Sequence, residues 1–120
     1  MRRELAKIKA TSLGYEDHGI FTAYLTVDYA VGTQGVGGYA LDRYDKPNDR
    51  RIGTAYGHEW IIRVLRACGV DRWEKLVGRT IWVLQDESKP AGFGNKVIGI
   101  ENLETEPGER FLFADLEVKS

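Results

Sequence analysis

The run from Ile20 to Tyr29, IFTAYLTVDY, constrains the fold more than any other stretch of the chain. It is rich in β-branched and aromatic residues, and Phe21, Ala23, Leu25 and Val27 alternate with more polar neighbours. This alternation is typical of a strand with one buried face. We therefore expect the chain to be built around a sheet that contains this strand.

Other segments indicate what accompanies this strand. Weaker strand patterns fall at residues 4–11, 34–42, 79–85, 96–103 and 111–118. A helix is expected from Thr54, which can cap it, to Gly69, which would end it. A second, short helix is expected between Asp71 and Gly78. The sequence thus predicts an α+β fold, a mainly antiparallel sheet with a two-helix hairpin inserted between strands.

Length and composition narrow the class of protein. The 120 residues suit a single domain over 1–120, and 42% hydrophobic residues suffice for a packed core. Lysine and arginine number 17 against 18 acidic residues, a balance that disfavours duplex nucleic acid as the main partner. No apolar run is long enough for a membrane span, and no signal-peptide pattern is present. A cytoplasmic protein is expected, with its one cysteine, Cys68, buried in the helix.

Catalytic and metal-binding patterns are weak. The two histidines, His18 and His58, lack the spacing that brings metal ligands together. Glu16, Asp17 and His18 lie in one turn, and no nucleophile is placed to use them. We expect no metal, no cofactor and no enzymatic activity.

The segment from Glu87 to Val97, ESKPAGFGNKV, admits two interpretations. It can be a hairpin loop between two strands, which needs no ligand. It can also cradle an anion, because its glycines allow close approach of backbone N–H groups, Ser88 and Asn95 offer neutral hydrogen bonds, and Lys89 and Lys96 add charge. The glycines of QGVGGYALD, by contrast, favour a strand with a bulge or close packing over a phosphate loop. No helix follows them, as a dinucleotide-binding site would require.

Aromatic and arginine residues add a second hint of a ligand. Arg51 and Arg110 could clamp phosphates. Trp60 and Trp73 are expected in the core. Rings that could stack on a base, or simply fill the core, are those of Tyr15, Tyr24, Tyr39, Tyr56, Trp82 and Phe93.

Four segments resemble one family. KATSLGYEDHGIFTAYLTVDY, GVGGYALD, RIGTAYGHEWIIRVL and WEKLVGRTIWV are similar to small phage and prophage proteins of the Thoeris anti-defence family one, the phage sponge proteins. The resemblance covers about residues 7–100. It implies a homo-oligomer, from dimer to hexamer, that acts in the cytoplasm of an infected bacterium. Its ligands would be cyclic ADP-ribose isomers made by an immune TIR protein, sequestered without cleavage, and in some members cyclic di- or trinucleotides.

The resemblance also suggests site residues. Asn95 in GFGNK and Arg110 in GER match the family's ligand-contacting asparagine and arginine, and Trp82 is the expected stacking residue. Arg51 is the candidate for a separate cyclic-oligonucleotide pocket. Neighbours expected to take part are Ser88, Phe93, Gly94 and Lys96. The alternative function is a phage inhibitor module that binds a host defence protein directly through an aromatic surface.

Overall fold

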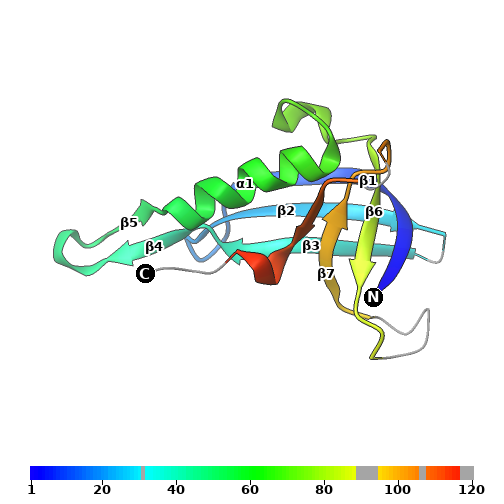
Figure 1. Ribbon diagram of the computed structural model, residues 1–120. Coiled ribbons are helices and arrows are strands. Elements are labelled where there is room, and N and C mark those ends of the chain that lie inside the picture. The colour runs from blue at the N-terminus through cyan, green and yellow to red at the C-terminus, as the bar shows by residue number, and fades with distance from the viewer. Residues whose placement is uncertain (31, 89–94, 106–107, 117–120) are drawn as a thin grey trace.

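A six-stranded antiparallel sheet forms the body of the protein in the computed structural model, which describes residues 1–30, 32–88, 95–105 and 108–116 (Figure 1). Its strand order is β3-β2-β1-β6-β7-β8. The strands are β1 (Arg2–Tyr15), β2 (Phe21–Tyr29), β3 (Gly32–Ala40), β6 (Thr80–Gln85), β7 (Val97–Glu101) and β8 (Arg110–Leu112). The expected strand at Ile20 to Tyr29 is confirmed as β2, and it lies between β1 and β3.

The glycine-rich segment forms strand β3, as the sequence predicts. The register between β2 and β3 shifts between Thr22 and Tyr24, which marks an irregularity in the pairing. Gly37 and Gly38 have φ angles of +103° and +84°, a region that residues with side chains rarely adopt. A Cβ on Gly37 would also lie 2.6 Å from the carbonyl oxygen of Ala23. These glycines therefore serve the backbone path of the strand.

Helix α1 (Ala55–Cys68) begins and ends where the sequence predicts. The side chain of Thr54 accepts a hydrogen bond from the Gly57 N–H, and Gly69 closes the helix in the left-handed conformation with φ +70°. Cys68 is buried as expected, and burial raises the pKa of its thiol to about 12. This thiol stays protonated at neutral pH.

The core lies between α1 and one face of the sheet. Trp60 is fully buried, as expected, and its ring is surrounded by three other aromatic rings at centroid distances of 5.8 to 6.1 Å. The sheet contributes side chains that alternate along its strands, including Ala6, Ile8, Leu25, Val27, Ile81, Val83, Ile100 and Phe111. Trp73, expected in the core, is only partly buried: it packs at the edge, and its Nε1 donates to the Thr11 hydroxyl at 3.1 Å.

The predicted two-helix hairpin is wrong. In the described parts of the chain α1 is the single α-helix, and the second segment forms only one 3₁₀ turn, Trp73–Lys75. Arg72 stands at the N-cap of this turn with no side-chain cap bond. The eight residues between the left-handed Gly69 and Gly78 allow at most about two helical turns, and so short a helix gains too few hydrogen bonds to offset the cost of nucleation.

Residues 42–53 form a separate two-stranded hairpin, although residues 43–53 show no strand pattern in the sequence. Strand β4 (Asp42–Asp45) pairs with β5 (Arg50–Gly53) through a 3₁₀ turn at Lys46–Asn48. Asp49 ends that turn with φ +48°, and the Tyr44 hydroxyl donates a hydrogen bond to its carboxylate. Side-chain bonds of this kind stabilise a turn that hydrophobic alternation does not reveal.

The last predicted strand, residues 111–118, is shorter than expected. Strand β8 covers only Arg110–Leu112, and a 3₁₀ turn, Phe113–Asp115, follows it. Phe113 is buried there, with its ring 5.8 Å from Trp60. Residues 117 and 118 lie outside the described part of the chain.

Replacing Thr54 with alanine should lower the free energy of unfolding by about 1–2 kcal/mol. The hydroxyl accepts from the Gly57 N–H at 2.9 Å and donates to the Leu41 carbonyl at 2.8 Å, so both bonds are lost together. Urea denaturation followed by circular dichroism measures the change. As a control, Thr33→Ala removes an exposed bond to Asp28 and should cost much less. Equal losses in the two variants would contradict the capping role.

Candidate functional site

A row of paired residues crosses the face of the sheet opposite α1. Ile81 and Val83 point into the core, so Trp82 between them points to the other face. In the strand register, Trp82 lies opposite Leu5 on β1 and Glu101 on β7. Glu101 in turn lies opposite Arg110 on β8. Because directly opposed residues share a face of the sheet, these side chains lie together.

We call Arg3, Trp82, Glu101 and Arg110 the Trp82 cluster. The Arg110 Nε and Nη2 atoms lie 2.8 and 2.7 Å from Oε1 of Glu101. The Arg3 Nη1 donates to Oε2 of the same carboxylate at 3.2 Å, and the Arg3 guanidinium carbon lies 4.8 Å from the centre of the Trp82 ring. One carboxylate thus holds two guanidinium groups beside an aromatic ring.

The burial of these groups differs in a way that suits ligand binding. Glu101 is only 4% exposed, whereas the side chains of Arg3 and Arg110 are 42% and 43% exposed. A planar guanidinium presents several N–H donors in a fixed fork, more than one carboxylate oxygen can use. The cluster can therefore receive an anionic group next to a flat ring.

A second polar group lies at one end of the helix-side face, and we call Tyr29, Gln34, Gln85 and Asn95 the amide cluster. The Tyr29 hydroxyl donates to Oε1 of Gln34 at 2.9 Å and accepts from Nε2 of Gln85 at 3.5 Å. Nε2 of Gln34 donates to the backbone carbonyl of Asn95 at 3.4 Å. Asn95 itself is 3% exposed. Burial raises the pKa of Tyr29, so its hydroxyl remains a donor at neutral pH.

The remaining residues predicted in the segment 87–97 have local roles where they are described. The Ser88 hydroxyl donates to the Asp86 carboxylate at 2.8 Å, and both are exposed or nearly so. The Lys96 side chain is exposed, while its carbonyl accepts from the Asp86 N–H at 3.1 Å. Phe93 and Gly94 lie outside the described residues, and their part in ligand binding remains a prediction.

Arg51 is engaged by a carboxylate. Its Nε and Nη2 donate to Asp42 at 2.8 and 3.0 Å, and Asp42 also accepts from the Phe21 N–H at 3.2 Å. The hydrogen bond from Arg51 is the main cause that lowers the pKa of the Asp42 carboxyl. Arg51 thus joins β5 to β4, and its predicted role toward cyclic oligonucleotides remains a prediction.

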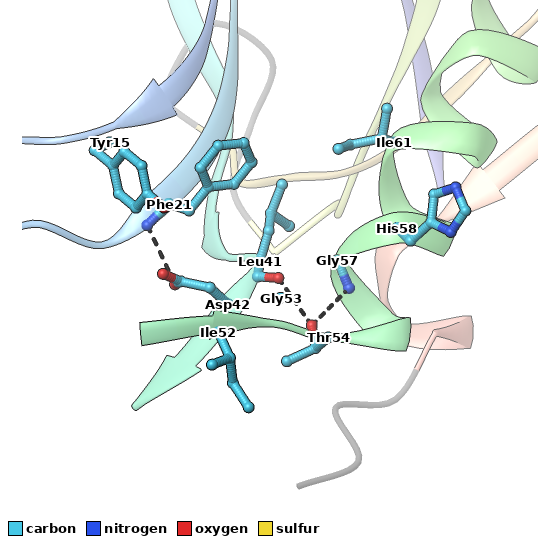
Figure 2. A pocket seen from close by; sticks show the side chains of 10 residues that line it. All are labelled: Tyr15, Phe21, Leu41, Asp42, Ile52, Gly53, Thr54, Gly57, His58 and Ile61. Atoms are coloured by element: carbon cyan, nitrogen blue, oxygen red, sulfur yellow. Dashed lines mark hydrogen bonds between the residues drawn. The ribbon is translucent and has the colours of Figure 1, made fainter. Parts of the chain in front are cut away.

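A pocket of about 310 Å³ opens beside this ion pair, at the start of α1 (Figure 2). Apolar side chains form much of its wall, and His58 lies toward the helix side. The polar atoms that Figure 2 joins by dashed lines bond to one another: Thr54 to Leu41 and Gly57, and Asp42 to Phe21. The lining residues are Tyr15, Phe21, Leu41, Asp42, Ile52, Gly53, Thr54, Gly57, His58 and Ile61.

The structure brings together some predicted site residues and separates others. Trp82 and Arg110 share one cluster, whereas the Asn95 carbonyl contacts Gln34 and Arg51 lies on the β4–β5 hairpin. Sequence analysis missed Arg3 and Glu101. Glu101 had a usable signal, because a carboxylate inside the apolar run VIGIE needs a positive partner if it is buried.

Comparisons of the chain with protein-family models, with curated proteins and with solved structures find no match. In the parts of the chain that the structure describes, no group of three or more histidine, cysteine, aspartate and glutamate side chains could hold a metal ion. The described helices are all too short or too polar to cross a membrane.

Proposed function

We propose that this protein binds and sequesters a cyclic nucleotide immune signal, foremost a cyclic ADP-ribose isomer, without cleaving it. It would act as a phage or prophage anti-defence protein in the cytoplasm of an infected bacterium. The observation that carries the proposal is the Trp82 cluster, where two half-exposed arginines stand beside an aromatic ring. The resemblance of residues 7–100 to the phage sponge proteins supports the choice of ligand.

The chemistry of the Trp82 cluster suits such a ligand. A nucleotide base can stack on an aromatic ring or on a guanidinium plane, and a pyrophosphate accepts hydrogen bonds from arginine. Glu101 fixes Arg110 through two contacts to one oxygen, which lowers the entropy lost when a ligand binds. Sequestration needs tight binding and no group that attacks the ligand.

The direct test is incubation of the protein with the product of an activated TIR enzyme. We expect the free signal to fall in the filtrate, and heating the complex to return the intact molecule by mass spectrometry. Recovery of linear ADP-ribose would contradict sequestration and indicate hydrolysis. A signal that stays in the filtrate would remove the proposed ligand.

Arg110→Met should weaken binding of the cyclic ADP-ribose isomer at least about tenfold, because a hydrogen bond to a charged group contributes about 1.5–3 kcal/mol. Isothermal titration calorimetry measures the affinity. The matched control is Arg66→Met, which removes the same charge from an exposed position on α1. Equal affinity of the two variants would exclude the Trp82 cluster as the binding site.

An inhibitor module that covers a host defence protein is the second candidate. Its support is Leu5, which is 50% exposed and lies opposite Trp82 in the register. Aromatic residues are enriched at protein interfaces, and an exposed leucine beside one enlarges the apolar surface that it offers. Thermal unfolding in the presence of a panel of nucleotides separates the two functions. A ligand at one hundred times its dissociation constant raises the free energy of unfolding by about 2.7 kcal/mol. A protein-only inhibitor would show no such shift.

A further inference from the structure

Arg2, at the start of β1, holds a buried nitrogen that lacks an acceptor. Its Nη1 atom is covered from solvent and has no hydrogen-bond partner among the described residues. A guanidinium stays charged at every physiological pH, and a buried N–H without an acceptor is costly. In native proteins a buried donor of this kind nearly always bonds to an acceptor, which can be a water molecule, an ion or a ligand.

The side chains of the amide cluster near Arg2 are polar and uncharged. Arg2 lies directly opposite Gln85 in the register of β1 and β6, so the two side chains share the helix-side face. Gln85 belongs to the amide cluster, in which it bonds to Tyr29 and through it to Gln34. These groups can donate or accept hydrogen bonds beside Arg2 without adding charge.

Glu4 is the charged residue that faces this region from the same strand. It lies two residues beyond Arg2, on the same face, and its charge contributes to the raised pKa of Tyr29. Arg2 forms no ion pair with any carboxylate in the described parts of the chain. Because Glu4 offsets the charge of Arg2, an anion here would be held mainly by hydrogen bonds, and a polyanion would be repelled by Glu4.

We propose that Arg2, with Gln85 and the rest of the amide cluster, binds a phosphate group, either free or attached to a small molecule. The phosphate oxygens would accept from the buried Nη1 of Arg2 and from the side-chain amides near it. This site lies on the opposite face of the sheet from the Trp82 cluster, because Arg2 and Arg3 alternate along β1. It is therefore independent of the proposed nucleotide site.

The test compares Arg2→Met with wild type in phosphate-free buffer and in inorganic phosphate at constant ionic strength. Wild type should show a melting temperature that rises with phosphate, and Arg2→Met should show no such rise. In phosphate-free buffer the variant should be at least as stable as wild type, because a buried N–H without an acceptor has been removed. Calorimetry should give a phosphate affinity lowered about tenfold or more.

Arg43→Met is the matched control, since it removes an exposed arginine from β4 and should respond to phosphate as wild type does. Ribose 5-phosphate, titrated in parallel, shows whether the site also accepts a phosphate attached to a sugar. Should Arg2→Met fail to fold, Arg2→Gln keeps a polar head opposite Gln85 and tests the same loss of charge. The proposal would be overturned if neither inorganic phosphate nor ribose 5-phosphate raised the melting temperature of the wild type. It would also be overturned if an Arg2 variant bound them as tightly as the wild type does. An Arg2→Met variant that is less stable in phosphate-free buffer would overturn it too, because the residue would then be structural.

Discussion

Trp60→Ala should lower the free energy of unfolding by about 3–5 kcal/mol, the range for large aromatic side chains removed from a core. The Trp60 ring is fully buried and touches three other aromatic rings, those of Tyr39, Phe111 and Phe113. Gly37 leaves the room that its edge occupies, since a Cβ there would lie 3.1 Å from the ring. The substitution would therefore open a cavity between α1, strands β3 and β8, and the 3₁₀ turn that follows β8.

Trp60→Phe separates the loss of volume from the loss of the indole nitrogen. Among the described residues, Nε1 of Trp60 is buried without a hydrogen-bond partner, so phenylalanine removes no bond and should cost less than half as much as alanine. Urea denaturation should be followed by far-ultraviolet circular dichroism, because both substitutions remove a tryptophan fluorophore. A loss below about 1 kcal/mol for Trp60→Ala would contradict its place at the centre of the core.

Where the sequence predicted the fold well, the signal was local. Helix α1 has a threonine cap, a glycine stop and an apolar stripe over several turns, and all three agree. The second predicted helix had cap-like residues as well, but the glycines at positions 69 and 78 left it too short to propagate. The β4–β5 hairpin escaped prediction because its stability comes from turn contacts and from the Arg51–Asp42 pair, which no alternation reveals.

The candidate site could be predicted only in part, because its residues come from strands far apart in the sequence. Trp82 and Arg110 were each singled out, yet their proximity depends on the pairing of β6 with β7 and of β7 with β8. Arg3 joins them from the other end of the chain, and Glu101 holds both arginines. Contacts between residues 98 positions apart in sequence, such as Arg3 and Glu101, follow from sheet order, which single-strand patterns do not fix.

Asp42→Ala should lower the free energy of unfolding at neutral pH by about 2–3 kcal/mol. Asp42 is 9% exposed and accepts hydrogen bonds from the Phe21 N–H and from the Arg51 guanidinium, so alanine leaves both without this acceptor. The Arg51 side chain is 28% exposed, and partial solvation keeps the loss below that of a fully buried pair. Asp42→Asn retains the shape of the side chain, so it should lower the free energy of unfolding by less than Asp42→Ala does.

Acidification should erase the difference between wild type and Asp42→Asn. The bond from Arg51 lowers the pKa of the Asp42 carboxyl in the folded chain, so the ionised form stabilises the fold above the unfolded value of about 3.9. That contribution disappears as the pH falls through the lower, folded-state pKa, where both wild type and variant carry a neutral group.

Urea denaturation at a series of pH values from neutral downward tests this expected loss of the stability difference. Asp71→Asn is the control, because its ion pair with Lys75 is exposed and should change stability far less at any pH. A gap between wild type and Asp42→Asn that stays constant into the acid range would show that charge is not what Asp42 contributes.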